Sequence, residues 1–257
     1  MSVRWCKMVN NLSAVDQAAS DGFDSVQLTV GLLMNLSEPQ FIRQKDHLVK
    51  SGLAFEVCAA PLPMDVRVTQ KGFNLYVWTE YLKKAVQRLA ELGCCKLAWS
   101  DGRARVLPWE GDVMSLKEQL LQFLFMLCEV AGHYDITVLV EPLGPRRTNF
   151  LNTMEEIDDF IPLIGKKNLS SMISLRELTE IGLATADFTR YTHLISHVQM
   201  ENPLSAAGVR LCPRQGDGYE YRPLLQALRD IDYNGIITLP DDADNAGLTY
   251  CRTLWNE

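Results

Sequence analysis

The stretch VLVEPLGPRRTNFLNTMEEIDDFI, residues 138–161, decides the fold. It opens with a run of aliphatic residues that is typical of a buried strand. This run is followed by one carboxylate, Glu141, and ends at Pro142. A polar loop follows, and then a stretch with helical spacing. Strand, loop and helix in this order predict one βα unit. A charge at the end of a buried strand is costly unless something pairs with it, so Glu141 is expected to have a partner.

The same unit recurs along the chain. Residues 75–93 have helical spacing and Gly93 follows as a C-cap, while residues 115–134 are expected to begin at an N-cap Ser115, with Glu118 at capping-box spacing. Eight such units predict an α/β protein with a (β/α)8 barrel, and a doubly wound open sheet is the alternative. The strands are expected at residues 3–9, 24–30, 53–61, 95–101, 137–143, 169–174, 194–201 and 235–240.

Composition limits the domain organisation and the class of partner. A chain of 257 residues with 47% hydrophobic content and no low-complexity linker predicts a single domain over 1–257. The net charge of −7 argues against a nucleic-acid partner and favours a small neutral or cationic ligand. No apolar run approaches the roughly 18 residues of a membrane helix, so we expect no membrane partner and a cytoplasmic location. Seven cysteines without a CxxC pair are expected to be reduced core residues.

In a barrel of this kind the active site lies at the carboxyl ends of the strands. The residues expected to close each strand are therefore the first candidates for a site. They are Gln27, Ala60, Ser100, Asp101, Glu141, Ser174, Gln199 and Pro240.

Four segments together resemble a known family. DGFDSVQL (21–28), GCCKLAWSDGRARVLPWEG (93–111), the Glu-Pro stretch quoted above, and HVQMENP (197–203) running on to GIITLP (235–240) are similar in order and spacing to the xylose isomerase-like TIM barrels. This superfamily contains sugar isomerases and epimerases, including hydroxypyruvate isomerase. The resemblance implies a TIM barrel and a small carbohydrate ligand such as a ketose, a hydroxy-carbonyl compound or a polyol.

The resemblance also implies a divalent cation such as Mn or Mg, which the family holds through residues on strands 5 to 8. Of these ligands only Glu141 is present, because Ser174, Gln199 and Pro240 occupy the other three positions, and Gln27 replaces a glutamate on strand 2. One carboxylate with an amide and a hydroxyl would bind a hard dication only at about millimolar strength. No metal cofactor is therefore expected. A relocated metal site is the alternative, built from Glu141, Glu177, His197 and Asp241.

Without a cation, an arginine is expected to pair with Glu141 in a bidentate geometry. The candidates are on loops at the expected barrel mouth, and a solvated Glu141 with no special role is the alternative. These arginines are Arg210, Arg176, Arg146 and Arg105.

Two functions fit these residues. The first is a metal-independent sugar isomerase or epimerase, with Glu141, His197 and Glu177 as catalytic residues. Its substrate-binding residues would be Arg210, Gln199, Trp109 and Asp101, although a tryptophan such as Trp109 is more often structural and a lone His197 on a strand is more often a core residue. The second function is a noncatalytic binding or partner subunit that keeps the scaffold. A homodimer is expected from the resemblance alone.

Overall fold

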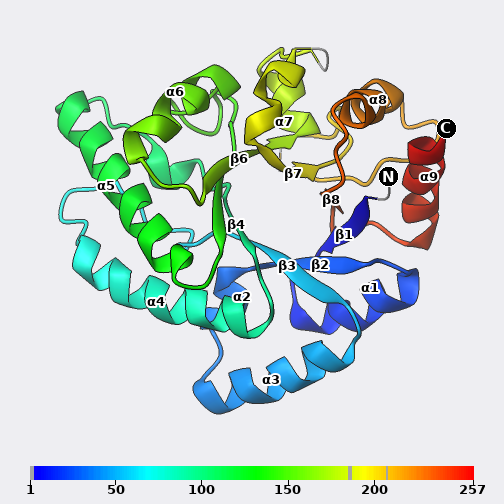
Figure 1. Cartoon of the computed structure of the whole chain (residues 1–257), viewed down its shortest axis with the longest axis horizontal. Coiled ribbons are helices and arrows are strands. Elements are labelled where there is room, and N and C mark those ends of the chain that lie inside the picture. The colour runs from blue at the N-terminus through cyan, green and yellow to red at the C-terminus, as the bar shows by residue number, and fades with distance from the viewer. Residues whose placement is uncertain (1–2, 185–186, 207) are drawn as a thin grey trace.

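The computed structural model describes residues 3–184, 187–206 and 208–257. Eight parallel strands form a closed barrel in sequence order, ringed by helices (Figure 1). The ring closes where β1 pairs with β8, with Arg4 opposite Ile236 and Lys7 opposite Leu239. The barrel prediction is confirmed, and the open sheet is wrong. The strands are β1 Arg4–Met8, β2 Ser25–Thr29, β3 Ala54–Ala59, β4 Lys96–Trp99, β5 Thr137–Val140, β6 Leu169–Ser174, β7 Ile195–Gln199 and β8 Ile236–Leu239.

At least one helix follows each strand, as parallel pairing requires a crossover connection. The strands end one to three residues earlier than several of the sequence-based ranges, so Glu141 lies just beyond β5. The helices are α1 Val15–Asp21, α2 Val30–Met34, α3 Glu38–Lys50, α4 Leu75–Glu91, α5 Val113–Gly132, α6 Met154–Ile164, α7 Leu175–Glu180, α8 Arg222–Asp230 and α9 Asn245–Asn256. Short 3-10 turns occupy η1 Leu12–Ala14, η2 Arg103–Arg105 and η3 Phe188–Leu194.

The ends of two helices test the expected caps. The C-cap of α4 is Leu92, and Gly93 is the next residue, with a φ of 82° in the left-handed region that suits glycine. Ser115 as the N-cap of α5 is wrong, because Asp112 takes that position and accepts from the backbone N of Met114 at 3.1 Å. The Ser115 hydroxyl instead donates to Asp112 Oδ2 at 2.7 Å. Either residue type can cap a helix, so the hydrophobic pattern alone did not distinguish them.

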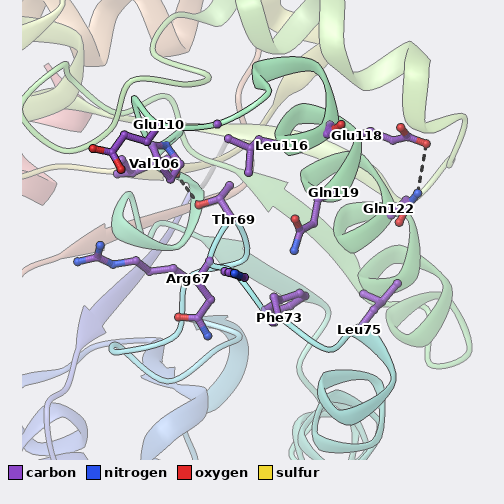
Figure 2. Close-up of a pocket in the computed structure, with 16 residues that line it drawn as sticks. Arg67, Thr69, Phe73, Leu75, Val106, Glu110, Leu116, Glu118, Gln119 and Gln122 are labelled. Atoms are coloured by element: carbon purple, nitrogen blue, oxygen red, sulfur yellow. Dashed lines mark hydrogen bonds between the residues drawn. The ribbon is translucent and has the colours of Figure 1, made fainter.

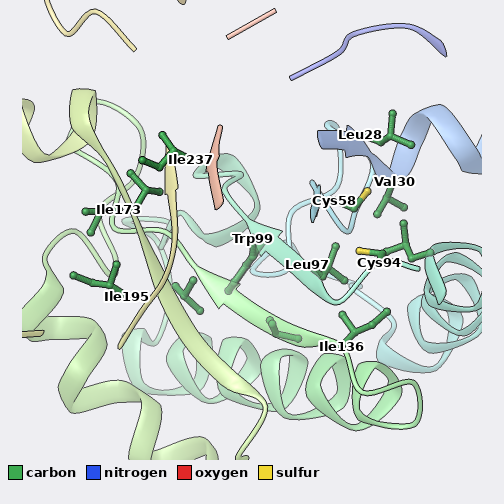
Figure 3. Close-up of a cluster of buried hydrophobic side chains, with 14 of the residues drawn as sticks. Leu28, Val30, Cys58, Cys94, Leu97, Trp99, Ile136, Ile173, Ile195 and Ile237 are labelled. Carbon is green, nitrogen blue, oxygen red and sulfur yellow. The ribbon is translucent and has the colours of Figure 1, made fainter. Parts of the chain in front are cut away.

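The barrel has an inner and an outer apolar core. Inside, small Ala59 and Ala98 pack with the larger Leu139 and Met172, which lets side chains from neighbouring strands fill the barrel. Outside, the other face of the strands packs against the helices; there Leu97, Trp99 and Ile136 belong to one large buried cluster (Figure 3). All seven cysteines are free, and six of them are buried.

Candidate functional site

A cavity of about 820 Å³ opens at the carboxyl ends of the strands. Its wall comes from the loops after β4, β5 and β7 and from helix α7, and it is mostly polar. The volume falls within the range of small-molecule sites. The charged residues lining it are Asp101, Arg103, Arg146, Arg147, Arg176, Glu177, Glu180 and Arg210.

Glu141 lies at the end of β5 and is only 1% exposed, so the expectation of a solvated side chain is wrong. Neither of its carboxylate oxygens has a hydrogen-bond partner in the described part of the chain. Burial raises its pKa to about 7, and the negative charge of Glu177 acts in the same direction. The positive charges of Arg210 and Arg147 favour the ionised carboxylate and therefore lower the pKa of Glu141. The result is a buried carboxyl group that exchanges a proton near neutral pH.

The expected bidentate arginine at the Glu141 carboxylate is also wrong. Arg105 is fully buried, but its Nη2 donates to the backbone carbonyl of Glu141, and its guanidinium lies 5.6 Å from the Trp99 ring centre. Burial lowers the pKa of Arg105 to about 10, partly offset by the negative charge of Glu141. Arg176 donates to backbone carbonyls of the loop after β7, at 2.8 Å from Ala206 and 3.0 Å from Ser205. Sequence spacing places an arginine on a loop but does not give the direction of its long side chain.

Glu177 lies in the first turn of α7, where two donors hold it. The backbone N of Gly144 donates to Oε2 at 2.8 Å, and Arg147 Nη1 donates to Oε1 at 3.1 Å. Arg147 also donates to the carbonyl of Ser100 at 3.2 Å. Glu177 is therefore buried with a fixed orientation, and Arg147 links the loops after β4 and β5 to it.

The structure adds Glu201, which the sequence reasoning missed. It is buried, its Oε1 lies 3.4 Å from Ser174 Oγ, and its Oε2 lies 3.8 Å from Arg210 Nε. Burial raises its pKa, while Arg210 lowers it. The sequence feature that could have identified Glu201 is the spacing of two between His197, Gln199 and Glu201. This spacing puts all three side chains on one face of an extended strand.

His197 lies below this group, inside the barrel. Its Nε2 is 3.3 Å from Gln27 Oε1 and 3.2 Å from Thr238 Oγ1. Burial lowers its pKa to about 3, and the positive charge of Lys96 adds to the shift, so the imidazole is neutral at pH 7. Gln27 also accepts from Gln199 Nε2 at 3.5 Å, so a polar chain runs from His197 toward the mouth.

The two remaining candidates lie in different places. Asp101 lines the cavity, and its Oδ1 accepts from the backbone N of Arg103 at 2.9 Å. Trp109 is 98% exposed and is not among the residues that line the cavity. Glu177 and Arg210 also line the cavity, whereas Glu141 and Gln199 are buried and are not among its lining residues.

A second cavity, of about 900 Å³, lies on the outer rim between the loops after β3 and β4 and helix α5 (Figure 2). Two of its polar side chains are held by backbone carbonyls: Gln119 Nε2 donates to the Val68 carbonyl at 2.6 Å, and Thr69 Oγ1 donates to the Val106 carbonyl at 2.5 Å. None of the candidate catalytic residues lines it. The mouth cavity is therefore the better candidate site.

The donor set at the mouth does not fit the family's dication. In the described residues, no group of three or more His, Cys, Asp and Glu side chains is arranged to hold a metal ion, so the relocated site is wrong. Asp241 instead accepts a hydrogen bond from the exposed Asn10 side chain. The Gln199 amide oxygen accepts from Arg210 Nη1 at 3.2 Å, so a guanidinium occupies the place next to a former ligand position. A positive group there opposes a second cation by charge repulsion.

Gly102 permits a close approach between the two loops that carry most of the arginines. Its φ of −65° suits any residue, but a Cβ there would lie 2.5 Å from the carbonyl oxygen of Arg147. We expect Gly102→Ala to lower the free energy of unfolding by about 1–3 kcal/mol, because backbone must shift. Gly31→Ala in α2 is the matched control, since its Cβ meets nothing within 4 Å, and it should stabilise by about 0.5–1 kcal/mol. Equal effects in urea unfolding would contradict this account.

The pKa of Glu141 also makes stability depend on pH. Because the pKa is raised from 4.5 to about 7 in the fold, the native state holds a proton that the unfolded state has lost between these values. Stability therefore falls as pH rises through this window, by up to about 3 kcal/mol. We expect Glu141→Gln to unfold at higher urea concentration than the wild type at pH 8 and at a similar one at pH 4.5. A variant that is less stable at pH 8 would instead show that nearby arginine charges stabilise the ionised Glu141.

Comparisons with known proteins agree with the barrel. The D-psicose 3-epimerase solved in the presence of D-fructose has a TM-score of 0.82 at 13% identity, covering 99% of this chain and 100% of that one. The D-psicose 3-epimerase with D-tagatose from Clostridium cellulolyticum H10 has a TM-score of 0.80 at 13% identity and covers 98% and 99%. A 3-keto-D-glucoside 4-epimerase from E. coli has a TM-score of 0.79 at 17% identity and covers 98% and 100%. These identities show the fold alone.

Two other findings accompany this likeness. No curated protein matches the chain significantly. Within the described residues, every helix is too short or too polar to cross a bilayer. The family model described as xylose isomerase-like TIM barrel matches residues 15–248, and the chain therefore belongs to the xylose isomerase-like TIM barrel family.

Proposed function

We propose that this barrel is a sugar isomerase or epimerase that works without the family's divalent metal. The observation that carries the proposal is the buried Glu141 carboxyl, whose pKa is raised to about 7 and whose oxygens have no hydrogen-bond partner among the described residues. A general base works best when its pKa is near the operating pH. The solved neighbours named above are sugar epimerases, and two of them were crystallised with a ketose.

In this proposal, Glu141 removes the proton from the carbon next to the carbonyl of a small carbohydrate. Negative charge then develops on the carbonyl oxygen of the substrate. Arg210 and Arg147 would stabilise this charge, since both guanidinium groups already act on the negative charge of Glu141 at the same site. An epimerase needs a second group to return the proton on the other face. Glu201 suits this role better than Glu177, because burial favours its protonated form whereas two donors hold Glu177.

His197 has a positioning role in this proposal. A neutral imidazole with a pKa of about 3 is a poor proton donor, but its contacts to Gln27 and Thr238 fix the chain of amides that leads to Gln199. Gln199 and Asp101 then bind the hydroxyl groups of the sugar.

The test is proton exchange in deuterated water. The protein, treated with EDTA, is incubated with a panel of ketoses and hydroxy-carbonyl compounds, and deuterium at the carbon next to the carbonyl is followed by NMR. We expect exchange that added Mn or Mg does not increase. Exchange that requires Mn would contradict the metal-independent mechanism.

The second candidate is a noncatalytic binding or partner subunit. It is favoured by the uncharged side chains at family positions, namely Gln27, Ser174, Gln199 and Pro240. Sugar binding without any exchange would support this alternative.

A further inference from the structure

The wall of the mouth cavity differs in charge from the whole chain. Five arginines and three acidic residues line it, which leaves an excess of two positive charges, or one when the buried Glu201 that pairs with Arg210 is included. The whole chain has a net charge of −7. The positive lining is therefore local, and it can attract a small anion at a site where the remaining surface repels one.

Three of the five arginines are paired with carboxylates. Arg147 pairs with Glu177 at 3.1 Å, Arg146 with Glu180 at 3.3 Å, and Arg210 with Glu201 at 3.8 Å. Arg176 is bound to loop carbonyls, which accept its hydrogen bonds but do not neutralise its charge.

Arg103 differs from the other four. No hydrogen bond or ion pair involves its guanidinium among residues 3–184, 187–206 and 208–257, and the side chain is exposed at the cavity. It lies in η2 next to Gly102, which packs against the backbone of Arg147. The partly engaged Arg146 is the residue before Arg147 and is 78% exposed. The loops thus hold a guanidinium with five unused donors at the same mouth as Arg146.

We propose that the carbohydrate acted on at this site bears an anionic group, a phosphate or a carboxylate, and that Arg103 binds this group with help from Arg146. A guanidinium presents two parallel N–H donors that match either oxyanion. The sugar body would then extend from Arg103 down toward Glu141. This inference rests on the proposed function and replaces the neutral or cationic ligand expected from net charge.

Isothermal titration tests it with a matched set of probes: fructose, fructose 6-phosphate, glucuronate and inorganic phosphate. We expect fructose 6-phosphate or glucuronate to bind at least ten times more tightly than fructose, and the stronger of the two identifies the group. Arg103→Gln should weaken the anionic probe about tenfold or more and leave fructose unchanged. Arg43→Gln on the exposed face of α3 is the control and should change neither.

Other results overturn the inference. The inference fails if fructose and both anionic probes bind with equal affinity, or if no anionic probe binds. It also fails if Arg103→Gln has the same effect on all of them. The proposed function is tested separately. Proton exchange on neutral ketoses alone would leave the function standing without the anion site, whereas Arg103-dependent anion binding without exchange would leave the anion site without the catalytic function.

Discussion

Glu141→Gln is expected to slow proton exchange on the substrate by about 10²- to 10⁴-fold, the usual contribution of a general base. Glutamine has nearly the same shape but cannot accept the proton. The variant should still bind the sugar, since in the described structure the carboxylate oxygens of Glu141 have no hydrogen-bond partner whose loss would disturb the mouth. NMR exchange rates at saturating ligand measure the effect. Glu155→Gln, in the exposed first turn of α6, is the control and should exchange at the wild-type rate.

The pH profile gives the same prediction a second readout. Glu141 acts as a base only when ionised, so kcat/KM should rise as pH increases through about 7 and level off above it. A profile that turns near pH 4.5 would mean that the base is a solvated carboxylate elsewhere. Because Glu141→Gln should also stabilise the protein at pH 8, loss of exchange in a better-folded variant would separate catalysis from folding.

Arg88→Leu is expected to lower the free energy of unfolding by about 2–4 kcal/mol, because a buried polar group that loses its hydrogen bond costs about 1–3 kcal/mol. Arg88 is a buried residue of α4 that donates to the carbonyls of Leu33 at 2.6 Å and Leu36 at 3.0 Å, and to Glu38 Oε2 at 2.8 Å. Its guanidinium also lies 4.6 Å from the Phe41 ring centre. Leucine would fill part of the space but leave the two carbonyls without their donor.

Lys84→Met provides the control for Arg88. Lys84 is on the same helix and pairs with the same Glu38 at 3.6 Å, but its side chain is exposed. The loss should be below about 1 kcal/mol in urea unfolding, because an exposed ion pair contributes little. Similar losses for the two variants would show that Arg88 acts through its charge and not through the buried hydrogen bonds.

Much of the fold could be predicted from sequence because it depends on hydrophobic pattern. Runs such as residues 138–140 are apolar on both faces, as strands covered by helices outside and packed inside must be. The strand ends were predicted less well: the strand expected over 137–143 ends at Val140, which pairs with Trp99 of β4. Cap positions were also predicted less well, as the pair Asp112 and Ser115 shows.

The sequence indicated which side chains lie at the carboxyl ends of the strands, but not what they contact. Strand order alone brings Glu141, Ser174 and Gln199 to one end of the barrel. The partner of Glu141 depends on where a flexible arginine points, and Arg105 reaches the backbone carbonyl instead of the carboxylate. Glu201 was not predicted because it lies two residues beyond Gln199, where β7 ends, and it is not one of the family's ligand positions.

The closed ring of strands has a consequence for handling the protein. Pairing of β1 with β8 leaves no sheet edge with unpaired backbone groups, and such edges are where strands from other molecules add. Aggregation by strand addition therefore requires the ring to open first. Heating close to the unfolding transition should start it, while concentrating the folded protein at low temperature should not.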